Sequence, residues 1–380
     1  MKNIFFLVGE RSADLHASYV VKELQKRKPN LLLWGIGGKN MQNYGFTSIY
    51  PFKRFNVIGF IEVLKHLIFF FNVKKRVKLF FKNRKPELVV LVDYPGLNLQ
   101  IAKMAHKMGL KILYYITPQF WAWKEKRKYK LKKYCNKLAV IFPFEKKLLT
   151  DINTNVEFVG HPLNEELTFS LSKAQFIKKY NLSKHNKFIG FIPGSRNSEI
   201  KKILPPLVDT IEKLKDQRNS NYEILISYSD SVSKSLFDKL ISPIKEKVSI
   251  VDETHSLMKY SDFLICKSGT SSLEAAYIGT PLIVIYKTSY ISYLIAKFFV
   301  KIDMIAMPNI ILGKKVIPEL IQNDLNSKSL LKSIENHFEN KKNYKQLKNH
   351  LKMVSAKLKG KKPSKKVAQI IIEQINETKE

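Results

Sequence analysis

Short runs of apolar residues alternate with longer amphipathic stretches along most of the 380-residue chain. Leu88–Val92 is apolar at every position, which indicates a strand buried on both faces of a sheet. Between the runs, stretches such as Asp14–Lys28 and Ile200–Asp216 have helical spacing. The predicted strands are Asn3–Val8, Leu31–Trp34, Glu87–Val92, Lys111–Ile116, Leu138–Phe142, Lys187–Ile192, Glu223–Ser227, Val248–Val251, Phe263–Cys266 and Leu282–Tyr286.

This order of strands and helices predicts an α/β protein with two doubly wound parallel sheets of the Rossmann type. A polar stretch rich in Asn, Ser and Lys, residues 161–187, separates the two series of strands. We therefore expect a first domain over residues 1–165, a second over 185–340, and a basic helical tail over 341–380. Because ligands bind at the carboxyl ends of parallel strands, the residues that follow each strand are the candidates for function.

The charge of the chain points to an anionic partner. Lys and Arg number 66 against 32 Asp and Glu, and the formal net charge of +34 suits nucleic acid or an anionic membrane surface. The abundance of Lys, Asn and Ile also fits an AT-rich genome, which accounts for part of the excess. Lys74–Arg76 follows Phe69–Phe71, and cations beside aromatic rings suit a lipid headgroup boundary. Because no nucleic-acid recognition module is recognisable, we expect no nucleic-acid partner.

The chain shows no sequence signal for secretion or for crossing a membrane. Its longest apolar stretch, Val57–Val73, is broken by Glu62, Lys65 and His66 and is too polar to span a bilayer. The apolar run at the N-terminus has the length of a strand rather than of a signal core. Cys135 and Cys266 lack metal-ligand spacing and suit buried thiols in a reducing compartment. We expect a cytoplasmic protein that binds a membrane peripherally.

In the first half, polar or glycine-rich loops follow the predicted strands. Gly9 permits a tight turn, Glu10 follows it, and Ser12 or Asp14 can cap the next helix. The later segment Gly35–Gly38 resembles a dinucleotide fingerprint, but the third glycine of that motif is missing, so we expect no NAD site.

A carboxylate and two tryptophans are the other candidates in the first half. Asp93 ends its most apolar strand, where a carboxylate can accept a proton from a substrate hydroxyl or can simply cap a turn. Trp121 and Trp123 lie in a loop after a strand. Two rings are hard to bury in a loop, and sugar stacking, lipid contact and core packing are the three explanations for them.

Two loops in the second half have the composition of phosphate-binding turns. Each follows a strand and leads into a helix, so backbone N–H groups can approach an anion, and Arg196 can add a charged fork. Glu274 can hold ribose hydroxyls, or it can complete a capping box at the start of its helix. Two such turns indicate a nucleotide diphosphate, and without an Asp-x-Asp pair or His ligand spacing we expect no metal and no cofactor. The turn residues are Gly194, Ser195, Arg196, Ser268, Gly269, Thr270 and Ser271.

Taken in order, the motifs of this chain resemble those of the lipid-A-disaccharide synthases from Phe6 to about Gln322. The Trp-Ala-Trp and Gly-His-Pro-Leu elements are the most specific matches. The matching motifs are Gly9-Glu10-x-Ser12-x-Asp14, Gly35-x-Gly37-Gly38-x-x-Met41-Gln42, Ile58-Gly59-Phe60-x-Glu62-Val63-Leu64, Asp93-x-Pro95-x-x-Asn98, Pro118-x-x-Trp121-Ala122-Trp123, Pro143-Phe144-Glu145, Val159-Gly160-His161-Pro162-Leu163, Pro193-Gly194-Ser195-Arg196, Ser268-Gly269-Thr270 with Glu274, Pro308-Asn309, and Pro318-Glu319-x-x-Gln322.

The resemblance implies a GT-B fold, in which two Rossmann-like halves face a cleft. It implies an inverting transfer of 2,3-diacylglucosamine from UDP-2,3-diacylglucosamine to the 6-hydroxyl of 2,3-diacylglucosamine 1-phosphate, with release of UDP. Asp93 would be the general base, Arg196 would lie beside the diphosphate, and Glu274 would bind the ribose. Asn309 and Gln322 would approach the donor.

The resemblance also implies an acceptor site and a cellular location. The acceptor would meet the first loop and the tryptophan loop, and the protein would lie on the anionic inner face of the inner membrane of a Gram-negative bacterium. It leaves the oligomeric state open. A UDP-N-acetylglucosamine 2-epimerase is the alternative enzyme of this fold, and a nucleic-acid-binding protein is the alternative that charge alone suggests. The acceptor residues would be Gly9, Glu10, Ser12, Asp14, Trp121 and Trp123, and the membrane contacts Ile58, Phe60, Leu64 and Leu67.

Overall fold

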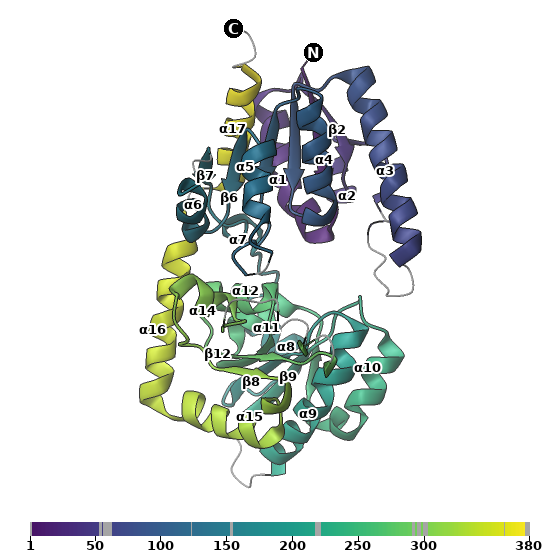
Figure 1. Cartoon of the computed structure of the whole chain (residues 1–380). Coiled ribbons are helices and arrows are strands. Elements are labelled where there is room, and N and C mark those ends of the chain that lie inside the picture. The colour runs from purple at the N-terminus through teal and green to yellow at the C-terminus, as the bar shows by residue number, and fades with distance from the viewer. Residues whose placement is uncertain are drawn as a thin grey trace. The chain divides into compact units, whose positions relative to one another are not determined.

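The chain forms two compact units, residues 1–166 with 359–380, and residues 167–358. Each unit has one parallel β-sheet with helices on its faces, as the alternation of apolar runs and amphipathic stretches predicts (Figure 1). Within the described residues, no helix is both long enough and apolar enough to cross a bilayer. The computed structural model describes residues 2–52, 55, 63–122 (the backbone only for 63–67), 124–152, 155–216, 222–290, 293–294, 298, 303–360 and 362–376.

The sheet of the first unit has the order β3-β2-β1-β4-β5-β6-β7. β1 pairs with β2 on one side and with β4 on the other, so the strand order reverses between β1 and β4. At such a reversal the loops after the two strands diverge and leave room for a ligand. The strands are β1 (Asn3–Val8), β2 (Leu32–Ile36), β3 (Thr47–Ser48), β4 (Leu88–Val92), β5 (Ile112–Tyr115), β6 (Lys137–Val140) and β7 (Val156–Phe158).

Helices cover both faces of this sheet. One apolar core joins β1, β4 and β5 to α3, α4 and α5. On the other face, the last helix of the chain, α17, packs beside α1 (Figure 1, yellow and purple). The helices are α1 (Arg11–Arg27), α2 (Lys39–Gln42), α3 (Val63–Arg84), α4 (Pro95–Lys107), α5 (Arg127–Tyr134), α6 (Pro143–Thr150), α7 (Leu163–Glu166) and α17 (Pro363–Asn376).

Polar contacts as well as apolar packing attach α17 to the first unit. The backbone N–H and the hydroxyl of Ser364 donate to the two carboxylate oxygens of Glu165 at 2.8 and 2.6 Å. Lys366 donates to the carbonyl of Phe158 at 2.7 Å and lies 3.1 Å from the carboxylate of Glu157. The C-terminal helix is therefore an integral part of the fold that the N-terminal residues begin.

The sheet of the second unit has the order β10-β9-β8-β11-β12-β13, and its order reverses between β8 and β11. The strands are β8 (Lys187–Ile192), β9 (Tyr222–Ser227), β10 (Ser249–Val251), β11 (Phe263–Lys267), β12 (Leu282–Tyr286) and β13 (Glu319–Ile321). The helices are α8 (Lys173–Lys179), α9 (Asn197–Asp216), α10 (Lys234–Ile241), α11 (Thr254–Tyr260), α12 (Thr270–Ile278), α14 (Met307–Leu312), α15 (Ser327–Ile334) and α16 (Lys341–Leu358).

All ten predicted strands are confirmed, with ends that differ by at most two residues. The three strands that the pattern misses, β3, β7 and β13, have two or three residues each and lie at sheet edges, where an apolar run is not needed. Residues 341–380, predicted as one tail, belong to both units, because α16 lies in the second and α17 in the first. Cys135 and Cys266 are free and buried, and burial raises the pKa of both thiols.

Candidate functional site

Asp93 lies at the carboxyl end of β4, where the order of the first sheet reverses. Asp93 and Tyr94 both have positive φ, 49° and 46°, which is strained for residues with side chains. Two donors hold this backbone, since the amide of Asn98 and the hydroxyl of Tyr114 each donate to the carbonyl of Asp93 at 2.7 Å. The strain is thus maintained by the surrounding fold, and it fixes the carboxylate at the end of the strand.

The surroundings of Asp93 favour a carboxylate that can take up a proton. Burial, with a smaller contribution from the nearby charge of Glu10, raises the pKa of Asp93 to about 6. The N–H of Tyr94 and the charge of His16 act in the opposite direction. A base with a pKa close to the working pH can accept a proton and still be mostly ionised.

The first loop supports the Asp93 turn in a way that the sequence did not reveal. A Cβ on Gly9 would lie 2.3 Å from the ring of Tyr94, so only glycine fits where the loop after β1 meets the loop after β4. α1 begins at Arg11 after Glu10, with no side-chain cap, so the predicted capping by Ser12 or Asp14 is wrong.

Asp14 joins two loops instead. It is buried, and its carboxylate accepts hydrogen bonds from the backbone N–H groups of Gly38 at 2.6 Å and Asn40 at 3.1 Å. A Cβ on Gly38 would meet that carboxylate at 2.6 Å. Asp14 therefore stabilises the glycine-rich loop after β2, and its two oxygens are occupied within the protein.

Trp121 is anchored by a buried carboxyl group. Its indole N–H donates to Glu145 at 3.1 Å, and its ring packs edge-on against Phe144 at 5.1 Å. Glu145 is 1% exposed, and burial raises its pKa to about 7, with the charge of Asp93 contributing in the same direction. These contacts favour packing over sugar stacking for Trp121. Trp123 lies outside the described residues.

Two polar residues near Asp93, Glu145 and His16, were given no role from the sequence, although Glu145 belongs to the matched motif Pro143-Phe144-Glu145. Glu145 lies in the first turn of α6, the helix that follows β6, and its place in a matched motif is the signal that could have identified it. His16 lies on α1, where its ring forms a hydrogen bond with Glu166, and its charge lowers the pKa of Asp93. A single histidine on an amphipathic helix gives no signal in the sequence.

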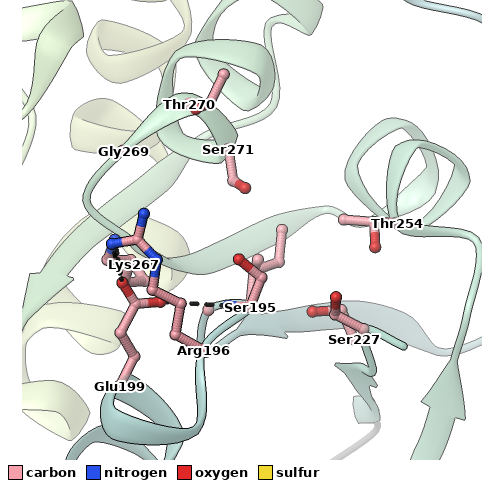
Figure 2. A pocket seen from close by; sticks show the side chains of 12 residues that line it. Ser195, Arg196, Glu199, Ser227, Thr254, Lys267, Gly269, Thr270 and Ser271 are labelled. Carbon is pink, nitrogen blue, oxygen red and sulfur yellow. Dashed lines mark hydrogen bonds and ion pairs between the residues drawn. The ribbon is translucent and has the colours of Figure 1, made fainter. Parts of the chain in front are cut away.

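The second unit has a cavity of about 380 Å³ at the end of its sheet, beside the β8–β11 reversal (Figure 2). The predicted turn residues Gly194, Ser195, Arg196, Gly269, Thr270 and Ser271 all line it, so the structure brings the two turns predicted to bind phosphate together. Its other lining residues are Ile192, Glu199, Ser227, Ser229, Thr254 and Lys267.

Two glycines give the cavity its shape. Gly194 has φ +118° and Gly269 has φ +150°, conformations that side chains rarely adopt. A Cβ on Gly194 would also lie 2.5 Å from the carboxylate of Glu199. The backbone at both turns can therefore come close to a ligand.

The cavity contains two cations and one carboxylate. The Arg196 side chain is 70% exposed, and its guanidinium lies 3.8 Å from Glu199. Lys267, at the end of β11, lies 2.9 Å from the same carboxylate. Figure 2 shows Glu199 directed at both cations, with Ser227 and Thr254 across the cavity. Lys267 and Glu199 were not predicted to be site residues.

Glu274 has a different setting from the one its spacing suggested. The cap of α12 is formed by Gly269 and Ser272, whose hydroxyl accepts from the Gly269 N–H at 3.3 Å, so the capping box with Glu274 does not form. Glu274 lies 3.5 Å from His255 and is not a lining residue of the cavity.

Three residues predicted to approach the donor use their polar atoms inside the unit. Ser268 donates to the carbonyl of Ile305 at 2.8 Å. Asn309 is fully buried, donates to Glu319 at 2.8 Å and accepts two backbone N–H groups. Gln322 exchanges two hydrogen bonds with the backbone of Thr288. These hydrogen bonds hold loops of the second unit in place, and the donor contacts of these residues stay a prediction.

A separate cationic surface lies on α3 and α4 of the first unit. Ile58 and Phe60, predicted to contact a membrane, lie outside the described residues, as do the side chains of Leu64 and Leu67 on α3. Further along α3, Ile68, Phe71 and Leu79 are exposed by 67%, 63% and 58%. Beside them is a groove of about 530 Å³ lined by Lys74, Lys78, Gln100, Lys103, Met104, Lys107 and Met108.

Comparison with known proteins identifies the family. A family model described as lipid-A-disaccharide synthetase matches residues 4–375. Lipid-A-disaccharide synthase of Geobacter metallireducens is 32% identical over 374 residues, covering 98% of this chain and 97% of that protein.

Solved structures show the fold. UDP-GlcNAc 2-epimerase from Neisseria meningitidis bound to UDP-GlcNAc superposes with a TM-score of 0.64 at 14% identity, covering 99% of this chain and all (100%) of that one. The calicheamicin glycosyltransferase CalG4 gives 0.64 at 11% identity, with 100% of both chains covered. Two parallel-sheet units with such neighbours have the GT-B fold.

Proposed function

Because this chain belongs to the lipid-A-disaccharide synthase family, whose members are glycosyltransferases, we propose that it transfers 2,3-diacylglucosamine from UDP-2,3-diacylglucosamine to the 6-hydroxyl of 2,3-diacylglucosamine 1-phosphate. The products are a β(1→6)-linked disaccharide and UDP. The transfer inverts the anomeric carbon, because a single attack displaces the leaving group from the opposite side.

The observation that carries this proposal is the carboxylate of Asp93, held in strained backbone at the end of β4 with a pKa raised to about 6. Asp93 accepts the proton of the acceptor 6-hydroxyl as its oxygen forms a bond to the anomeric carbon of the donor. The bond from that carbon to the diphosphate breaks, and UDP carries away the electron pair. A positioned base contributes roughly 100- to 10,000-fold to such a rate.

The second unit supplies the site for the leaving group. Arg196, the turns at Gly194 and Gly269, and the first turn of α12 line one cavity. Backbone N–H groups at a helix start and a guanidinium fork together suit a diphosphate. Thr270 and Ser271 add hydroxyl groups to the cavity wall. We place the diphosphate of the donor's UDP here. Glu274, which does not line the cavity, would contact the ribose beyond it, and no metal or other cofactor is required.

The cationic surface on α3 and α4 supports work at an anionic membrane face. Neither helix contains an Asp or Glu in its sequence, and the groove between them is lined by four lysines and two methionines. Exposed Ile68 and Phe71 lie on the same helix, and apolar anchors beside lysines favour a headgroup boundary. The protein would bind its acylated donor and acceptor at this surface, on the cytoplasmic face of the inner membrane.

One assay tests the proposed reaction. The purified chain is incubated in detergent with UDP-2,3-diacylglucosamine and 2,3-diacylglucosamine 1-phosphate, and the expected products are the disaccharide and an equal amount of UDP. Asp93→Asn is the control for contaminating activity. The proposal is wrong if no disaccharide forms, and conversion of UDP-N-acetylglucosamine to its 2-epimer would instead favour the epimerase alternative.

A vesicle assay tests the membrane contact. Sedimentation with phosphatidylglycerol vesicles should exceed that with phosphatidylcholine vesicles, and Lys78→Glu with Lys107→Glu should reduce it strongly. Lys345→Glu with Lys352→Glu, the same charge change on exposed positions of α16, is the matched control and should reduce it much less. Equal losses in both variants would mean that only the overall charge matters.

A further inference from the structure

Glu199 places a carboxylate among the groups that suit a phosphate. Its Oε2 accepts the backbone N–H of Ser195 at 3.3 Å, and its Oε1 lies 2.9 Å from Lys267 and 3.8 Å from Arg196 (Figure 2). The Glu199 side chain is 14% exposed, so it lies inside the cavity wall. An N–H after a glycine turn, a lysine and an arginine are the donors that bind phosphate in other proteins.

A carboxylate and a diphosphate compete for these donors. Each donor has a limited number of N–H groups, and two anions on the same donors repel one another. Lys267 is only 19% exposed on its side chain, so it cannot turn freely to water when a second anion arrives.

From this geometry we infer that Glu199 is an internal anion that occupies the diphosphate site of the donor-free protein, and that the donor's diphosphate replaces it on Lys267 and on the Ser195 N–H. Lys267 is then a ligand of the donor alongside Arg196. The inference rests on the proposed function, because it takes the donor to carry a nucleoside diphosphate.

The inferred exchange of Glu199 for the diphosphate stabilises the site before the donor binds and helps UDP to leave after transfer. Without an anion between them, the charges of Lys267 and Arg196 would repel one another in a partly enclosed cavity. Glu199 neutralises them and keeps Lys267 pointed at the site. When UDP is the product, return of Glu199 to the same donors favours its departure, so the carboxylate lowers UDP affinity and speeds release.

The alternative is that Glu199 only supports Lys267 and stays in place when the donor binds. The two roles predict opposite signs for one measurement. If Glu199 competes, Glu199→Gln should strengthen UDP binding, by about three- to ten-fold for one charged contact relieved. If Glu199 only supports Lys267, the same change should weaken it.

Calorimetric titration of the full chain with UDP measures this difference. Glu212→Gln is the matched control, because it removes the same charge from the same helix, about 20 Å further along at 1.5 Å per residue, and should leave UDP affinity unchanged. Glu199→Ala is the second variant if Glu199→Gln does not fold, and it should also strengthen binding. Weaker UDP binding in these variants overturns the inference.

Lys267→Met in the Glu199→Gln background tests whether Lys267 is a ligand of the donor. UDP affinity should fall about ten-fold relative to Glu199→Gln alone, as expected when a charge-assisted hydrogen bond to a phosphate is lost. An unchanged affinity removes Lys267 from the donor site. If the wild-type chain makes disaccharide but Glu199→Gln weakens UDP binding, only this inference is rejected. If the wild-type chain binds no UDP, the proposed function itself is rejected.

Discussion

The two candidate sites occupy the same topological position in their units and are built with opposite electrostatics. Asp93 follows a strand at the reversal of the first sheet, half-buried and near the carboxyl groups of Glu10 and Glu145. Arg196 follows a strand at the reversal of the second sheet, in a cavity that also contains Lys267. The first site costs free energy to ionise and the second attracts anions, so one fold supports two chemistries through the residues placed after its strands.

The largest expected effect is on turnover and comes from the Asp93 site of the first unit. Asp93→Asn should lower turnover by roughly 100- to 10,000-fold, because the proton of the acceptor hydroxyl loses its base. UDP affinity, measured by titration, should change little, since the cavity proposed for UDP belongs to the other unit. Loss of UDP binding in this variant would assign Asp93 a different role.

The basic site should respond differently. Arg196→Ala should lower turnover by about 100-fold or more, because a charged donor to the leaving group is lost. Unlike the Asp93 change, it should also weaken UDP binding in the same titration. Arg196→Lys keeps the charge without the fork, and an activity equal to that of the Ala variant would show that fork geometry is what matters.

The two substitutions should also differ in their effect on stability. The pKa of Asp93 is raised to about 6 in the fold from 3.8. The stability that the protonated carboxyl confers is therefore present below about pH 4 and is lost as pH rises through 6. At pH 7.5, Asp93→Asn should raise the free energy of unfolding by about 1–3 kcal/mol, with the gain vanishing near pH 4.

Denaturant unfolding at both pH values measures this gain. The exposed Arg196 is the comparison, and Arg196→Ala should change the free energy of unfolding by less than about 0.5 kcal/mol at either pH. A destabilised Asp93→Asn chain at pH 7.5 would mean that the carboxylate is stabilised, and not strained, by its setting.

The smallest expected effect is a displacement of the pH profile. The rate should fall as pH drops below about 6, where Asp93 takes up a proton. The charge of Glu10 raises the pKa of Asp93, so Glu10→Gln should move this acidic limb to lower pH. A pH–rate profile of kcat/KM for both chains is the measurement, and a limb that moves to higher pH would contradict the assignment.

Much of both sites could be predicted from the sequence, because local residue patterns show where a buried strand ends. The unbroken apolar run before Asp93 marks a buried parallel strand, and Gly194 with Arg196 marks a turn that can bind an anion. A site residue that directly follows such a run needs only local information to be found.

The parts that were missed depend on contacts between distant segments. Lys267 meets Glu199 because β8 and β11 pair in parallel, which no local pattern states. Asn309 looks like a polar ligand in sequence, yet Glu319 and nearby backbone groups bury and satisfy it. Asp14 has the spacing of a helix cap, but its partner is a loop after another strand.

The return of α17 to the first unit has a consequence for how the protein is made. Val367, Ile370 and Ile371 are buried there, so the apolar surface that they cover on the first unit stays open until α17 has been synthesised. A ribosome delivers the N-terminal residues first, and the second unit can close while the chain is still growing. The unit that is translated first is therefore completed only after the whole of the second unit has been translated.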